Sequence, residues 1–197
     1  MGDSATPALI VGLRNPGEQY EATRHNLGAD VVATLAARHD AKFKRAPRIR
    51  AEMAVVAIGD TRAILARPNT YMNESGQAVA PLVDYFGMPL DRLLIVHDDI
   101  DLPFAKLRVQ EGGGSGGNNG VASTIRSLGN EEFWRLKCGV GRPPGRQEPA
   151  SFVLKRFGKN ERDDIDLLRQ YGADVIELFV TAGGDEARQQ AGEVKIG

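Results

Sequence analysis

The side chains best able to do chemistry lie in one polar segment near the start of the chain. Between Asn15 and Asn26 this segment carries amides, a guanidinium and an imidazole, and the imidazole belongs to His25. A histidine near its ordinary pKa can take a proton from water at neutral pH and return it to a leaving group. A lone histidine is more often structural than catalytic. The hypothesis of a general base therefore depends on which other polar side chains reach His25.

Three further polar clusters lie at residues 68–76, 96–101 and 111–120. Each follows a run that is typical of a strand. Open α/β sheets place their sites where strands end, so we expect these clusters to meet. The side chains expected to converge on His25 are Asn15, Asn73, Asp98 and Asn119.

Each cluster also has a simpler interpretation. Asn73 lies at the entry to a predicted helix and could be its N-cap, a common role for asparagine. The three carboxylates among residues 98–101 could bind Mg²⁺, cap the next element or orient a histidine. A magnesium site would need a second acidic cluster of matching geometry; none is evident, so no metal is expected. His39 and His97 are assigned structural roles, at a helix C-terminus and at a strand end.

The glycine-rich run 112–117 matches the spacing of two familiar loops. A dinucleotide loop should follow a wholly apolar strand, but residues 105–110 alternate between polar and apolar. A nucleophile elbow around Ser115 would need its histidine later in the chain, yet all three histidines precede Ser115. Two interpretations stay open: a flexible loop, or a loop that approaches a ligand closely while Asn119 presents an amide.

Apolar runs alternate with segments of helical periodicity along the chain. Gly59 and Asp60 separate two strand-like runs and indicate a hairpin. The predicted strands are 8–13, 51–58, 61–67, 93–97, 105–110 and 135–140. The predicted helices are 28–39, 74–87, 119–128 and 160–183. This mixture predicts a single three-layer α/β/α domain over residues 1–197, with a central mixed β-sheet. The ends, 1–7 and about 185–197, are expected to be flexible tails.

Composition narrows the class of protein. The chain has 197 residues, 42% hydrophobic and 26% charged, as in an ordinary soluble domain. A net charge of −1 argues against a polycation that coats nucleic acid but allows a local basic patch. The single Cys138 cannot form a disulfide framework, which fits a reducing compartment. No signal peptide or long apolar run is evident, so we expect a cytoplasmic protein without membrane contact.

Taken together, the clusters resemble the bacterial peptidyl-tRNA hydrolase family. Five segments follow the family's motifs in order: 12–17, 23–26, 71–73, 97–102 and 112–120. Two more extend the match: 139–145 and 152–154. The likeness covers roughly residues 8–183, and five motifs in register are far more specific than any one of them.

The resemblance implies a monomeric α/β/α hydrolase without metal or cofactor. Its substrate would be peptidyl-tRNA, whose ester between the peptide and the 3′ ribose is cleaved so that prematurely released tRNA is recycled. By similarity His25 is the general base and Asp98 orients its ring. The residues assigned to substrate binding are Asn15, Tyr20, Tyr71, Asn73 and Asn119. No obligate protein partner is expected.

Transfer RNA should be held mainly through its phosphates. The candidate cations, which could equally be solvated surface charges, are Lys106, Arg108, Lys137, Arg142 and Arg146. The chain departs from the family's pattern at Arg14, where a small residue is usual, at Gln110, where a basic residue is usual, and at Asn118, where histidine is usual. These departures bear on the rate, the tRNA affinity and the substrate preference.

Two other classes of function remain. The first is an RNA-binding relative with weakened or lost hydrolysis, against which the intact His25 and Asp98 argue. The second is a nucleotide-dependent or nucleoside-processing α/β enzyme, which would need a complete cofactor fingerprint.

Overall fold

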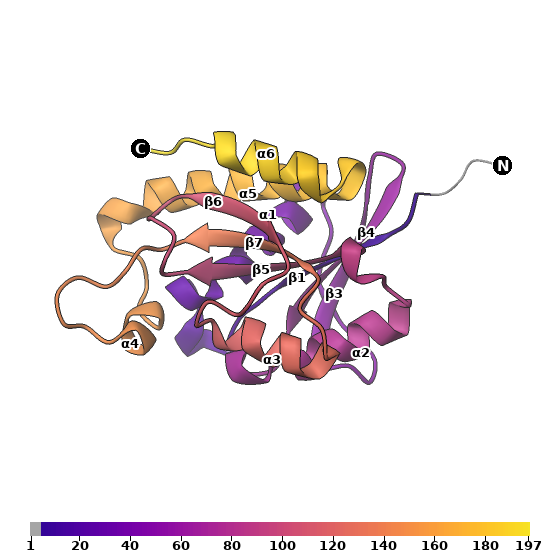
Figure 1. Ribbon diagram of the computed structural model, residues 1–197, viewed down its shortest axis with the longest axis horizontal. Coiled ribbons are helices and arrows are strands. Elements are labelled where there is room, and N and C mark those ends of the chain that lie inside the picture. The colour runs from indigo at the N-terminus through magenta and orange to yellow at the C-terminus, as the bar shows by residue number, and fades with distance from the viewer. Residues whose placement is uncertain (1–4) are drawn as a thin grey trace.

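The computed structural model describes residues 5–197 and is built around one seven-stranded sheet (Figure 1). The strand order is β2-β3-β4-β1-β5-β7-β6. The strands are β1 (Ala8–Gly12), β2 (Lys44–Arg45), β3 (Ala51–Ile58), β4 (Thr61–Pro68), β5 (Leu93–Asp99), β6 (Leu107–Glu111) and β7 (Trp134–Gly139). The central strands β4, β1, β5 and β7 are parallel to one another, whereas β2, β3 and β6 pair antiparallel. The predicted mixed sheet is confirmed.

Helices cover both faces of the sheet. The α-helices are α1 (Leu27–Arg38), α2 (Gly76–Phe86), α3 (Asn119–Leu128), α4 (Pro149–Val153), α5 (Arg162–Ala182) and α6 (Gly184–Glu193). One core joins the sheet to α1, α5 and α6, and a second core joins the opposite face to α2 and α3 (Figure 1). This arrangement confirms the predicted three-layer α/β/α fold. Within residues 5–197, no helix is long and apolar enough to cross a membrane.

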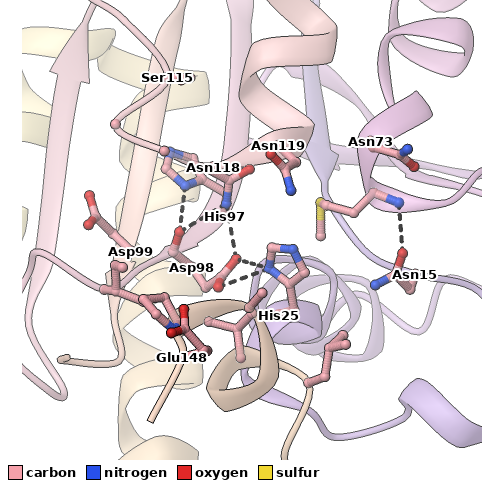
Figure 2. A pocket seen from close by; sticks show the side chains of 18 residues that line it. Asn15, His25, Asn73, His97, Asp98, Asp99, Ser115, Asn118, Asn119 and Glu148 are labelled. Atoms are coloured by element: carbon pink, nitrogen blue, oxygen red, sulfur yellow. Dashed lines mark hydrogen bonds and ion pairs between the residues drawn. The ribbon is translucent and has the colours of Figure 1, made fainter. Parts of the chain in front are cut away.

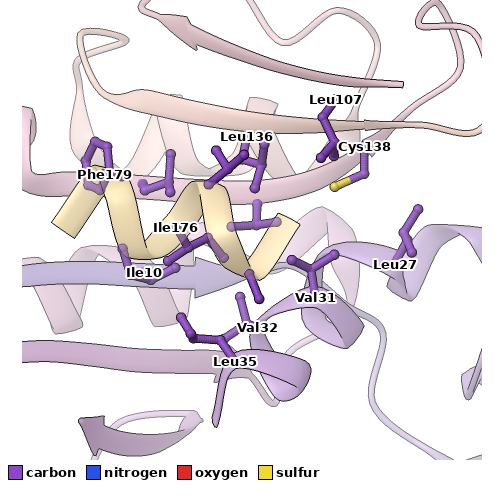
Figure 3. Close-up of a cluster of buried hydrophobic side chains, with 14 of the residues drawn as sticks. Ile10, Leu27, Val31, Val32, Leu35, Leu107, Leu136, Cys138, Ile176 and Phe179 are labelled. Carbon is purple, nitrogen blue, oxygen red and sulfur yellow. The ribbon is translucent and has the colours of Figure 1, made fainter. Parts of the chain in front are cut away.

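The larger core explains the apolar character of the central strands. All five residues of β1 are buried because helices pack on both faces of this strand. On one face, Ile10 meets Val31 of α1 and Ile176 of α5 within a single cluster (Figure 3). Cys138 lies in the same cluster, and burial raises the pKa of its thiol far above the ordinary value, so this cysteine is inert.

The start of α1 packs directly against the sheet through glycine. A Cβ atom at Gly28 would lie 2.1 Å from the backbone oxygen of Val96 in β5. A Cβ atom at Gly12 would lie 2.6 Å from the Gly28 oxygen. The absence of these atoms lets the helix touch the ends of β1 and β5. His25 lies two residues before this helix, so the same contact brings it to the end of β5.

The predicted elements are largely confirmed, including the hairpin, in which Ile58 pairs with Thr61. The prediction of a flexible tail at about 185–197 is wrong, because residues 184–193 form α6 and pack on the core. This helix buries only small side chains, Ala187 and Ala191, so its polar sequence has little apolar periodicity. The predicted N-terminal tail at 1–7 lies mostly outside the described residues. The short elements β2 and α4 were not predicted.

Candidate active site

A cavity of about 540 Å³ opens at the carboxyl ends of the central strands (Figure 2). The predicted site residues that line it are His25, Asp98, Asn15, Asn73 and Asn119. They come from the loop after β1, the segment after β4, the end of β5 and the start of α3. The predicted convergence at the strand ends therefore occurs.

His25 and Asp98 form a buried pair at the floor of this cavity. The His25 Nδ1 lies 2.9 Å from Oδ1 and 3.0 Å from Oδ2 of Asp98. Because the carboxylate can only accept, Nδ1 carries the proton, and Nε2 is left on the side of Asn119 and the cavity (Figure 2). Burial lowers the pKa of His25, but the charge and hydrogen bond of Asp98 outweigh burial and leave that pKa above 6.5.

Arg24 fixes the backbone that carries His25. Its guanidinium donates to the backbone oxygens of Lys155 and Arg156, pairs with Glu161 at 3.0 Å and lies 4.1 Å from the centre of the Phe152 ring. The Arg24 residue is only 7% exposed. The guanidinium of the polar segment is thus a structural tie between this segment and the region of α4 and α5.

Asn15 is held by two residues that sequence reasoning did not single out. Asn26 accepts from the Asn15 backbone N–H at 2.8 Å and donates to its backbone oxygen at 2.9 Å. The Asn15 Oδ1 accepts from the Met72 backbone N–H at 2.7 Å. These bonds fix the side chain and leave its amide nitrogen on the cavity side (Figure 2). The signal for Asn26 was its place in the motif that also contains His25.

Asn73 and Asn119 are exposed and line the cavity. Asn73 lies in a short 3₁₀ helix, Met72–Glu74, and α2 begins at Gly76, with Ser75 at the N-cap. The simpler interpretation of Asn73 as a helix cap is therefore wrong. Its amide is available to a ligand.

Asn118, one of the three departures from the family's pattern, is part of the site's framework. Its Oδ1 accepts from the backbone N–H groups of Gly120 and Val121 at 2.9 and 3.1 Å, which makes it the N-cap of α3. Its Nδ2 lies 3.2 Å from both the backbone oxygen and Oδ1 of Asp98. Asn118 thus joins the glycine-rich loop to the carboxylate that binds His25.

Arg14, another departure, points away from the cavity and ties neighbouring strands together. It donates to the Pro68 backbone oxygen at 2.9 Å and to Asn69 Oδ1 at 2.5 Å, and it pairs with Glu52 at 3.2 Å. These contacts hold the start of the segment that leads to Met72 and Asn73. The third departure, Gln110, is half-buried and donates to the backbone oxygen of Gly112 at 2.8 Å.

The two predicted tyrosines lie together, but neither lines the cavity. Tyr20 and Tyr71 meet edge to face, with ring centres 6.4 Å apart. The Tyr71 residue is 53% exposed. Since it directly precedes Met72, this aromatic pair adjoins the segment that holds Asn15.

The five candidate tRNA cations fall into two groups. Lys137 lies 3.6 Å from Asp99, and Arg142 pairs with Asp101, so both are engaged within the protein. The remaining cations are exposed and form no ion pair within residues 5–197: Lys106, Arg108 and Arg146.

The other two histidines lie where the sequence predicted them, at a helix C-terminus and near a strand end. His39 ends α1 and lies 2.8 Å from Glu177 of α5. His97 is 2% exposed and donates from Nδ1 to the backbone oxygen of Asp98 at 2.7 Å. Burial lowers the pKa of His97 and keeps it neutral. Within residues 5–197, no group of three or more histidine, cysteine or acidic side chains is placed to hold a metal ion.

Together, the fold and the site define an α/β protein with a buried histidine–aspartate pair, surrounded by amides in an open cavity at the strand ends. Comparison with known proteins identifies the family. The sequence model of the family described as peptidyl-tRNA hydrolase matches residues 9–196. A peptidyl-tRNA hydrolase of Mycobacterium marinum is 45% identical over 186 residues, which cover 94% of this chain and 97% of that protein.

Comparison with solved structures points to the same family. The crystal structure of peptidyl-tRNA hydrolase from Acinetobacter baumannii matches with a TM-score of 0.91 and 31% identity, covering 98% of this chain and 99% of that one. The chain belongs to the peptidyl-tRNA hydrolase family, as the resemblance predicted. A 5′-methylthioadenosine nucleosidase of Arabidopsis thaliana matches with a TM-score of 0.55 at 7% identity, covering 90% of this chain and 96% of that one. The nucleosidase shares only the fold with this chain, so it gives no support to a nucleoside-processing function.

Proposed function

We propose that this protein hydrolyses the ester between a peptide and the 3′ ribose of tRNA, with His25 as the general base. Membership of the family supports the reaction. The observation that carries the assignment to His25 is its buried bond to Asp98, which leaves Nε2 directed toward the cavity.

The proposed chemistry needs no nucleophile from the protein, because an ester has a better leaving group than an amide. Water gives a proton to Nε2 of His25 as its oxygen attacks the ester carbonyl. Asp98 holds the Nδ1 proton and stabilises the imidazolium that forms. The imidazolium then returns the proton to the departing 3′ oxygen of the ribose, which leaves a free peptide carboxyl group and a tRNA hydroxyl group.

The surrounding amides are proposed to orient the reactants. Asn15, Asn73 and Asn119 each present an amide on the cavity wall, where it can bind the peptide backbone, the water or the developing oxyanion. The adjoining pair of Tyr20 and Tyr71 is proposed to contact the substrate outside the cavity.

The tRNA is proposed to bind through its phosphates. The exposed cations Lys106, Arg108 and Arg146 are free to take part directly. Lys137 and Arg142 would have to exchange an aspartate for a phosphate, so smaller effects are expected from their removal. We also propose that the protein acts as a monomer in the cytoplasm, without an obligate protein partner; sedimentation of the purified protein tests the first point.

The test is release of free tRNA from purified N-blocked aminoacyl-tRNA. His25→Ala is expected to lower turnover by ~10²–10⁴-fold, the usual worth of a general base, and to leave tRNA binding intact. His39→Ala is the matched control, because this histidine lies at the far end of α1. Near-normal turnover by folded His25→Ala protein would remove His25 as the base.

An RNA-binding relative without hydrolysis is the alternative. It predicts tRNA binding by the unchanged protein and no release of tRNA above the rate of the spontaneous reaction. The assay separates the two functions directly, since binding and turnover are measured on the same preparation.

A further inference from the structure

A dense group of cations lies far from the tRNA candidates named above. Residues 41–51 contain five cations and no acid, although the whole chain has a net charge of −1. The five are Lys42, Lys44, Arg45, Arg48 and Arg50. All are exposed, and none forms an ion pair within residues 5–197. Such a concentration raises the local positive potential despite the near-neutral total.

Three of these side chains surround one hollow. A depression of about 320 Å³ is lined by Arg45, Ala46, Arg48, Ile49, Arg50 and Asn69. We call it the arginine hollow. A guanidinium presents a rigid fork of donors that matches the oxygens of a phosphate group. Several arginines around one depression suit an anion with several oxygens better than a single carboxylate.

The arginine hollow is held in shape by the backbone. The Ala46 N–H donates to the Ala51 oxygen at 2.9 Å and so closes the turn. Arg48 has φ of +64°, a left-handed conformation that is uncommon outside glycine and that persists where surrounding structure imposes it. Arg50 donates to Gln77 of α2 at 2.8 Å, and its backbone oxygen accepts from Asn69 at 2.8 Å.

Its position relates the arginine hollow to the active-site cavity. Asn69 lines the hollow, while Met72 and Asn73, three and four residues later, line the cavity. The hollow adjoins β2 at one edge of the sheet, and Arg108 lies on β6 at the opposite edge. Six inter-strand spacings of ~4.8 Å separate the two edges by about 29 Å. Cations thus flank the cavity on both sides.

We propose that the arginine hollow binds phosphodiester groups of the RNA substrate, on the side of the active site opposite Lys106 and Arg108. The proposal rests on the proposed function for the identity of the RNA. It predicts sequence-independent contacts, because guanidinium forks that bind phosphates read no bases. It also predicts that the hollow affects affinity and leaves the chemical step unchanged, since none of its arginines lines the cavity.

The test is the salt dependence of binding to deacylated tRNA, measured with the full-length protein. Arg45→Gln/Arg48→Gln should weaken binding and reduce the slope of log affinity against log salt by about 1–2, because each phosphate contact contributes ~0.7–0.9. With N-blocked aminoacyl-tRNA, KM should rise and kcat should not change. Arg45→Lys/Arg48→Lys keeps the charges and should restore most of the slope.

Arg62→Gln/Lys195→Gln is the matched control, with the same loss of two exposed charges at positions remote from the hollow. All three double variants should match the unchanged protein in circular dichroism, since the substituted side chains are exposed. A tRNA affinity and salt slope equal to those of the control would overturn the proposal. So would unchanged tRNA binding together with lost binding of polyglutamate, because the hollow would then serve an acidic polypeptide. Binding to deacylated tRNA is measured without turnover. A protein that fails to hydrolyse the ester would therefore contradict the proposed function and leave the proposal for the arginine hollow intact.

Discussion

Replacing Asp98 with asparagine tests the paired histidine most sharply, because the change keeps the shape of the side chain and removes its charge. Asn118 Nδ2 donates to the Oδ1 position at 3.2 Å, so it selects the orientation in which the new amide oxygen occupies that position. The new NH₂ group then occupies the Oδ2 position, 3.0 Å from Nδ1 of His25. The amide oxygen at the Oδ1 position stays 2.9 Å from Nδ1 and can still accept its proton, but the NH₂ group opposes that N–H. The tautomer with its proton on Nε2 therefore competes, and it removes the base from the cavity.

The size of the effect follows from these contacts. A hydrogen bond to a charged group contributes ~1.5–3 kcal/mol, whereas a neutral one contributes ~0.5–1.5. Losing the charge therefore costs about 1–2 kcal/mol of imidazolium stabilisation, or ~5–30-fold in rate. A general base usually contributes ~10²–10⁴-fold to the rate. The tautomer with its proton on Nε2 cannot act as the base and further lowers this contribution. We expect Asp98→Asn to lower kcat by at least ~10²-fold.

The pH–rate profile gives an independent measurement. The base acts when His25 is neutral, so turnover rises as the pH passes through its pKa, which burial lowers and Asp98 raises to a value above 6.5. Without the charge of Asp98, burial acts alone and the pKa falls, which moves the rising limb of any residual activity to lower pH. Asp101→Asn, in an exposed carboxylate that contacts Arg142, is the control and should leave this limb in place. A kcat within about threefold of normal together with an unmoved limb would refute the pairing.

Three further changes probe the site's framework. Asn118→His should lower stability by about 1 kcal/mol through loss of the α3 cap and should alter kcat or peptide preference, while the salt slope of tRNA binding stays constant in a filter-binding assay. Gln110→Lys adds a cation beside the glycine-rich loop; it should lower KM for peptidyl-tRNA and steepen its salt dependence, and an unchanged slope would place the residue away from RNA. Gly28→Ala should destabilise the protein by ~1–3 kcal/mol or more in urea unfolding, because its Cβ would lie 2.1 Å from the Val96 oxygen; a normal midpoint would show that α1 can shift freely.

Hydrophobic patterning alone predicted most of the sheet and its helical layers. The wholly apolar run at residues 8–13 indicated a buried strand, and the structure covers β1 on both faces. Gly59 and Asp60 indicated the hairpin between β3 and β4, which is present. These signals can be found within one short segment, because the spacing of its apolar residues reflects whether one or both of its faces are buried. The helix α6 has no such signal, since it packs through Ala187 and Ala191, with Gly184 against Trp134, and a tail was predicted in its place.

The roles of the asparagine side chains could not be predicted from local sequence patterns. Asn73 has the spacing of a helix cap, yet it lines the cavity, while Asn118 caps α3 and also bonds to Asp98. Both residues follow a strand and precede a helix, and the same side chain suits either role. The choice depends on which neighbour comes within hydrogen-bonding distance, and that neighbour lies far away in sequence. Similarly, Lys137 and Arg142 were predicted as RNA contacts, but only the folded chain shows the aspartates beside them.

The sequence by itself determined most of the strands and helices along the chain, the polar clusters at strand ends and, through its motifs, the family. The tertiary structure alone decided that Nδ1 of His25 faces Asp98, that Asn15 is held by Asn26 and Met72, and that three arginines surround one hollow. The physical reason is that apolar periodicity records which face of an element is buried. Hydrogen bonds and charge pairs instead depend on distances of about 3 Å between residues that only the packed sheet and helices bring together.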